Sequence, residues 1–244
     1  MKLLYKRQKL WLLTITVLAS SCKIMYTPTT IRPNMLQQKG DFHVGFNGFA
    51  MGEIYGGYAV TNHFGVTASV SGANEKTNHD DSYTDTNNNI VTTNEKKLVK
   101  RRDIEFSGGY FTQISESSTF EVFGGYGKFH STDYFTFTDN AYPDRSQSYK
   151  INSLSYNRIF IQPAVGYRSN HFDLYYANRF SNISFGSRHN DFISENSVVA
   201  RFGFSRVKFM AQLGLTIALN QHYEEYLPIT CGFGISYCFS SNQY

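Results

Sequence analysis

Apolar side chains recur at every second position over most of the chain. Near the C-terminus they are Ile229, Cys231, Phe233, Ile235, Tyr237 and Phe239, with small or polar residues between them. A period of two places successive side chains on opposite faces of a β-strand. The alternation predicts ten strands, at about residues 41–49, 52–60, 64–72, 102–113, 119–131, 154–168, 171–184, 197–205, 207–218 and 228–239.

The connections between these strands alternate in length. Short turns follow the second, fourth, sixth and eighth strands, and long loops are expected at 73–101, 132–153, 185–196 and 219–227. Only the first hairpin departs from this, with a short connection at Ala50 and Met51. Short turns on the periplasmic side and long loops on the other are typical of outer-membrane barrels. We therefore predict an all-β, antiparallel up-and-down transmembrane barrel of ten strands (eight is the alternative) over residues 41–239, with a tail at 240–244.

The two faces of the predicted strands differ in charge. One face is apolar in strand after strand, and the other holds most of the strand charges. A charge facing hydrocarbon costs several kcal/mol, so the charged face must line the lumen. The predicted lumen charge network consists of Glu53, Asp103, Glu105, Arg158, Arg168, Arg179 and Arg201.

Within this network, Arg158, Arg179 and Arg201 are expected to pair with Glu53, Asp103 and Glu105. Paired charges would fill the narrow barrel and close it to solutes. A charged pore or a buried binding site is the alternative.

Two further features bear on the strand map. An aromatic residue flanks each side of the four tight turns, namely Tyr58 and Phe64, Tyr110 and Phe120, Tyr167 and Phe172, and Phe204 and Phe209. This recurrence predicts an aromatic girdle at a membrane–water interface. Pro163 lies inside the sixth strand, where a bulge or a strand end is expected because proline cannot donate to a ladder.

Residues 1–21 have the anatomy of a signal peptide, with basic residues before an apolar stretch and small residues after it. Cys22 follows directly, and this ending resembles a bacterial lipobox. The resemblance implies cleavage before Cys22 and thioether lipidation of its thiol, with acyl chains such as palmitate. An ordinary secreted protein is the alternative. Residues 22–40 are interpreted as an extended lipidated tether, which would place the lipid in the inner leaflet.

Composition narrows the classes of function. The leader carries four of the 23 basic residues and no acid, so the remaining chain holds 19 basic and 19 acidic residues. A net charge of zero gives no reason to expect nucleic-acid binding. Cys231 and Cys238 lie seven residues apart on one predicted strand, about 23 Å at strand rise. Both are therefore expected to be free thiols.

Candidate chemistry is sparse. His130, with Ser131 and Asp133 nearby, is the candidate for an esterase or a lipid A deacylase, although geometry rather than sequence proximity defines a triad. The histidines show no metal-ligand spacing such as HExxH, so neither a metal site nor a cofactor is expected. The Asn- and Asp-rich loop 73–101 has oxygen ligands suited to calcium but lacks the DxDxDG pattern, which favours a plain loop.

The strongest charge cluster lies at the end of that loop. It consists of Lys96, Lys97, Lys100, Arg101 and Arg102. We interpret it as a patch that contacts lipopolysaccharide phosphates or the acidic surface of a protein partner. A solvated strand extension is the alternative.

Several stretches resemble a family of Bacteroidota outer-membrane lipoproteins of unassigned activity. They are CKIMYTPTTIRPNMLQQKGDFHVGFNG (22–48), YAVTNHFGV (58–66), FEVFGGYGKF (120–129), FIQPAVGYRSNHFDL (160–174) and ANRF (177–180). The resemblance covers nearly the whole chain after the leader. It implies an outer-membrane barrel and carries no catalytic residues.

Three functions remain open at this stage. The first is a non-enzymatic, lipid-anchored outer-membrane barrel, structural or accessory, that acts through its loops and rims, either alone or beside a larger outer-membrane machine. Its expected partners are outer-membrane lipids, lipopolysaccharide and other outer-membrane proteins. The second is an enzyme that modifies lipid or lipopolysaccharide. The third is a lipocalin-like carrier, which would place its apolar face inside and its charges outside.

Overall fold

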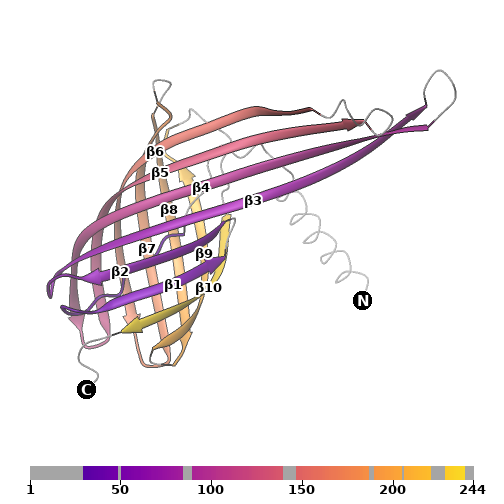
Figure 1. The fold of residues 1–244 in the computed structure, drawn as a ribbon. Coiled ribbons are helices and arrows are strands. Elements are labelled where there is room, and N and C mark those ends of the chain that lie inside the picture. The colour runs from indigo at the N-terminus through magenta and orange to yellow at the C-terminus, as the bar shows by residue number, and fades with distance from the viewer. Residues whose placement is uncertain are drawn as a thin grey trace, which may run out of the picture.

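A computed structural model describes residues 30–48, 51–84, 90–139, 147–186, 190–204, 206–220 and 229–239. Ten antiparallel strands close into one barrel in chain order, with β1 beside β10 (Figure 1). The prediction of a ten-stranded barrel is confirmed. The strands are β1 (Phe42–Gly48), β2 (Gly52–Ala59), β3 (Phe64–Thr84), β4 (Ile90–Ser115), β5 (Ser118–Asp139), β6 (Gln147–Arg168), β7 (Phe172–Ser184), β8 (Asn190–Gly203), β9 (Val207–Ala218) and β10 (Ile229–Phe239).

The barrel closes through a continuous ladder between the first and last strands. Phe42 pairs with Phe239 at one end of this ladder, and Gly48 pairs with Phe233 at the other. The Phe42 and Phe239 rings stack with their centroids 5.4 Å apart. Closure leaves no free edge in the membrane, where an unpaired backbone group would be costly. Among the described residues, no helix is long and apolar enough to cross a membrane.

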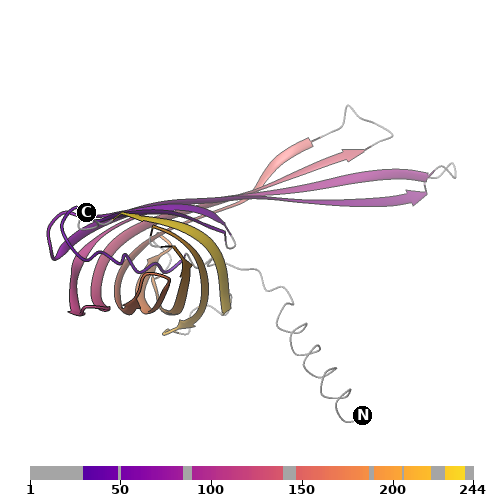
Figure 2. The same ribbon diagram turned by 90° about the horizontal axis from the view of Figure 1, so that it is seen from below.

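Four strands continue far past the barrel wall. β3 and β4 stay paired from Phe64 with Tyr110 to Thr84 with Ile90, and β5 and β6 extend beside them (Figures 1 and 2). We call this extension the blade, comprising residues 73–84, 90–101, 131–139 and 147–154. The loops expected at 73–101 and 132–153 are therefore mostly strand. Their sequence lacks the alternation because, beyond the base of the blade, neither face packs against hydrocarbon or a buried core.

Two smaller expectations are also wrong. β8 begins at Asn190, so the loop expected at 185–196 is shorter than predicted. β6 runs through Pro163 with no change of register, and Pro163 pairs with Val122 on the β5 side. On the β7 side the ladder skips from Ile161 to Ala164. The missing proline N–H is thus accommodated by a gap in one ladder and not by a bulge or a strand end.

The two faces of the wall are sorted as a membrane barrel requires. Outward apolar side chains are exposed, for example Ile159 at 65% and Leu213 at 61%, whereas Arg158 and Asp173 inside are 0% exposed. A lipocalin would show the reverse, so that alternative is contradicted. The aromatic residues that flank the tight turns all lie exposed on the outer surface, namely Tyr58, Phe64, Tyr110, Phe120, Tyr167, Phe172, Phe204 and Phe209.

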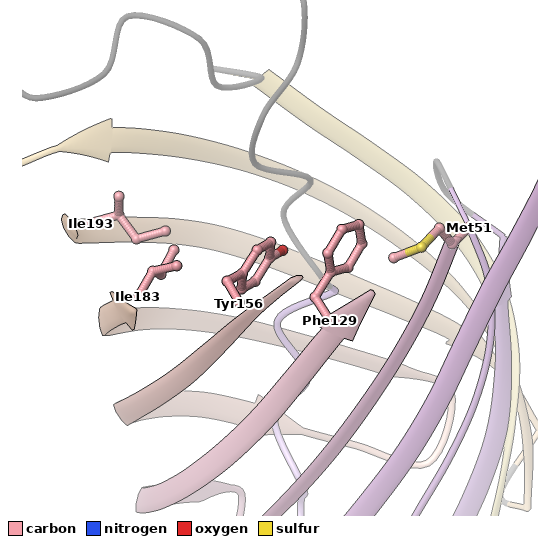
Figure 3. Close-up of a cluster of buried hydrophobic side chains, with 5 residues drawn as sticks. All are labelled: Met51, Phe129, Tyr156, Ile183 and Ile193. Carbon is pink, nitrogen blue, oxygen red and sulfur yellow. The ribbon is translucent and has the colours of Figure 1, made fainter. Parts of the chain in front are cut away.

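Apolar side chains also fill part of the lumen. Met51, Phe129, Tyr156, Ile183 and Ile193 form a buried cluster near the end of the barrel from which the blade extends (Figure 3). Met51 lies in the connection between β1 and β2, and the other four residues come from β5, β6, β7 and β8. The rings of Phe129 and Tyr156 stack with their centroids 4.6 Å apart. This cluster narrows the lumen between the charged residues and the end of the barrel from which the blade extends.

Candidate functional site

A carboxylate on β4 forms the centre of the buried charge network. Glu105 accepts hydrogen bonds from Arg158 (2.7 Å) and, through both of its oxygens, from Arg179 (3.1 Å each). Arg158 also donates to Asp103 at 3.3 Å. Arg32 lies 3.6 Å from Glu105. These side chains are all buried, and each charge has an opposite charge in contact, as burial requires.

Uncharged groups position the Arg179 guanidinium. Its Nε and Nη2 donate to the side-chain oxygen of Gln162 at 3.0 and 2.7 Å. Its Cζ lies 4.3 Å from the centroid of the Phe160 ring, within the range of a cation–π contact. The guanidinium is thereby held by β4 and β6 together.

A second group of charges lies nearer the short-turn end. Asp173 accepts from Arg201 at 2.9 Å and from Lys208 at 2.6 Å. Arg201 therefore pairs with a carboxylate outside the predicted set. Arg168 is only partly buried and donates to the carbonyl oxygen of Met35 at 3.2 Å.

The remaining predicted carboxylate finds its partner on the N-terminal segment. Glu53 contacts Arg32 at 2.8 Å, and the carbonyl of Arg32 accepts from the side chain of Gln162 at 2.9 Å. Arg32 belongs to residues 22–40, which we interpret from the sequence as an extended lipidated tether. Residues 30–36 of this segment lie buried inside the barrel and make contacts with its wall.

Polar and apolar contacts both fix this segment. The backbone N–H groups of Asn34 and Met35 donate to the two carboxylate oxygens of Glu121 at 2.7 and 3.1 Å. Met35 packs in a buried apolar cluster with residues of β2, β7, β8 and β9, and Leu36 packs with residues of β2, β4 and β5. We call residues 30–36 the plug.

The plug has a direction. Arg32 reaches Glu53, near the end of β2 that is remote from the short turns, whereas Leu36 packs with Ala59 at the short-turn end. The chain therefore descends the lumen before it enters β1. This differs from the expectation that the segment approaches the barrel from the short-turn side.

A small cavity adjoins the plug. A cavity of about 10 Å³, lined by side chains that include Arg32, His43 and Tyr55, has room for roughly one water molecule. Arg32, Asn34 and Glu121 could not be predicted from the sequence, because residues 30–36 have no strand period and Glu121 alone indicates no partner. The sequence around Pro33 contains no other motif that predicts its burial.

The residues considered for catalysis do not assemble. His130 lies on the outer face, where its ring nitrogens contact Ser155 at 2.6 Å and Thr132 at 2.9 Å. Ser131 and Asp133 have the opposite parity on β5 and face the other side of the sheet. Among the described residues, no group of histidine, cysteine or acidic side chains could hold a metal. Cys231 and Cys238 are free.

Other predicted residues are divided or fall outside the description. The basic run does not form one patch, since Lys96, Lys100 and Arg102 share the parity of outward Ile104 and the other two members face the opposite side. Cys22 and part of the candidate calcium loop, 85–89, lie outside the described residues.

Comparisons with known proteins bear on the architecture alone. No family model and no curated protein matches the chain. Among solved structures it is similar to the COG4313 outer membrane channel of Pseudomonas putida F1, with 10% identity and a TM-score of 0.43 over 86% of this chain and 100% of that one. It is also similar to the outer membrane protease OmpT of Escherichia coli, with 9% identity and a TM-score of 0.44 over 88% and 100%.

The sorting of faces, the closed ladder and the aromatic girdle together identify the chain as a transmembrane β-barrel of the outer-membrane type.

Proposed function

We propose that this protein is a non-conducting, lipid-anchored outer-membrane barrel that acts as a structural or accessory component through its blade and rims. The observation that carries this proposal is the plug. Arg32 bridges Glu53 of β2 and Glu105 of β4, and the next residues bind Glu121 of β5. A segment tied to three strands of the wall obstructs passage through a narrow barrel.

The rest of the lumen supports a closed barrel. Arg158, Arg179 and Arg201 are paired with carboxylates, so they do not line an open aqueous path. The apolar cluster of Figure 3 lies on the side of these charges that is nearer the blade. The parts of the molecule free to contact other molecules are therefore the blade and the rims.

Conductance in planar bilayers tests the closed barrel. The full chain should insert without producing stable ion channels, because the plug, the paired charges and the apolar cluster occupy the lumen. Replacing Arg32, Met35 and Leu36 together by alanine should loosen the plug and give intermittent conductance. Stable wild-type channels would contradict the proposal.

A pull-down from detergent-extracted outer membranes tests the accessory role. We compare the full chain with a variant in which Asn-Gly replaces residues 77–97, joining Lys76 to Leu98. These two residues pair directly across β3 and β4, so the barrel below keeps its register. The full chain should retain a partner that the shortened chain loses. If both recover no partner, the accessory role has no support.

The anchor is part of the same proposal. Seven residues lie between Cys22 and Thr30, and the eight residue steps span about 27 Å when fully extended. The plug descends from the long-strand end, so the lipid on Cys22 would enter the leaflet at that end. With short turns facing the periplasm, this is the outer leaflet and not the inner one.

An epitope inserted after Lys23 tests this arrangement. It should be reached by antibody on intact cells, while the same epitope after Tyr244 should need permeabilisation, because β10 ends at the short-turn rim. Labelling with a palmitate analogue should depend on Cys22. If the Cys22→Ala variant keeps both the label and the anchoring, lipidation of Cys22 is contradicted.

A further inference from the structure

Cations gather on one face of the blade and at its base. The outward face, which continues the membrane-facing surface, carries exposed basic side chains on all four long strands. These are Lys76 on β3, Lys96, Lys100 and Arg102 on β4, Lys128 on β5 and Lys150 on β6. No carboxylate with a described side chain shares this face of the blade. We call these six residues the basic face.

The opposite face holds cations that are already neutralised. Arg101 lies 3.1 Å from Glu75, and Lys97 lies 3.7 Å from Asp133. The run of basic residues seen in the sequence is thus two sets with different surroundings. Only the outward set lacks a carboxylate partner among the described ion pairs.

The basic face begins directly beyond the apolar band. The outward apolar band of β4 reaches Ile104, which is 48% exposed, and Arg102 lies two residues before it, about 7 Å along the strand. Arg102 lies across Gly72 of β3, since a Cβ there would be 2.8 Å from its Nη1. The basic face therefore starts at the level where lipid headgroups meet an apolar band.

Local contacts leave the cations available. Arg102 Nη1 donates to the backbone carbonyl of Arg101 at 3.0 Å, which leaves its remaining N–H groups free to donate. The Lys100 ammonium lies 5.2 Å from the Tyr134 ring centroid. Both contacts hold the charged ends near the sheet without neutralising them.

We propose that the basic face binds the phosphate groups of anionic lipids in the adjacent leaflet, of the class of phosphorylated lipid A. Closely spaced lysine and arginine side chains suit phosphate oxygens, and a lipid places its phosphates beside the chain that already contacts the apolar band. A nucleic acid or an acidic protein would gain nothing from the fact that the basic face continues the membrane-facing surface, whereas a lipid contacts both. This proposal assigns a class of ligand to the outer surface, and it holds whether or not the plug closes the lumen.

Matched double variants in the same strand test the proposal. Lys100→Gln with Arg102→Gln removes two charges from the basic face, and Lys97→Gln with Arg101→Gln removes two from the opposite face. The full chain in neutral detergent is titrated with bisphosphorylated lipid A and bound lipid is counted by native mass spectrometry. The first variant should bind about 10- to 30-fold more weakly, and the second should match the wild type.

Further arms identify the source of the phosphate. Lipid A stripped of phosphate should bind much more weakly than the bisphosphorylated form, and inorganic phosphate alone should show no comparable affinity. Heat-modified migration on gels confirms that each variant is folded. Equal losses in both double variants, unchanged binding in both, undiminished binding of dephosphorylated lipid, or binding of inorganic phosphate with equal affinity would each overturn the proposal.

Discussion

At the scale of single residues, the lumen shows how a narrow barrel accommodates buried charge. Glu105 is shared by Arg158 and Arg179, and Asp173 is shared by Arg201 and Lys208. Burial of either sign alone would be costly, so each group depends on its partners. Removing one member should therefore cost more than the pair itself contributes.

Arg158→Met tests this dependence. The change leaves Asp103 and Glu105 with fewer buried cations, so we expect the free energy of unfolding to fall by about 3–5 kcal/mol. Lys97→Met on the half-exposed blade pair should cost no more than about 1 kcal/mol. Urea unfolding in detergent micelles measures both. Similar small losses would show that the lumen charges are hydrated.

Glycines facing large side chains make a second residue-scale prediction. Gly166 pairs with Tyr175, and a Cβ at Gly166 would overlap the Tyr175 ring. Gly166→Ala should therefore destabilise the barrel by about 1–3 kcal/mol. At Gly124 a Cβ would meet only the Phe160 carbonyl at 3.7 Å, so Gly124→Ala is the control. Equal unfolding midpoints for the two variants would contradict the tight packing.

At the scale of elements, the plug and the blade were the parts that sequence did not predict. Strands that face lipid alternate because one side must be apolar, so the barrel from Phe42 to Phe239 was predictable. Lys97 and Arg101 lie on a strand with water on both sides, where no period is imposed. Arg32 becomes buried only when the barrel wall has folded around it. The sequence of residues 22–40 does not indicate which carboxylates of the wall pair with it.

Hydrogen exchange tests how the plug is fixed. Glu121→Ala removes the carboxylate that accepts the Asn34 and Met35 N–H groups. Loss of hydrogen bonds to a charged group should speed exchange across residues 30–36 by about 10- to 100-fold. Glu116→Ala, at an exposed turn, should leave the rate unchanged. Unaltered exchange in both variants would mean that apolar packing alone holds the plug.

At the scale of the whole molecule, the fold divides into a filled barrel and an exposed blade (Figures 1 and 2). In the proposed function, the barrel holds the protein in the membrane and the plug closes the lumen. One side of the barrel wall must face hydrocarbon to explain why the lumen charges and the plug are enclosed and the external cations lie beyond the apolar band. That sidedness is the central claim.

Tryptophan quenching by lipids brominated in their acyl chains tests that claim most directly. The chain's one tryptophan, Trp11, lies in the leader and is replaced by Phe, so single probes can be placed at neighbouring positions on β6. Ile161→Trp puts the indole on the 51% exposed outer face, and Phe160→Trp puts it on the 5% exposed inner face. Strong quenching of the first and weak quenching of the second is the predicted result. The reverse order, or equal weak quenching of both, would contradict the account.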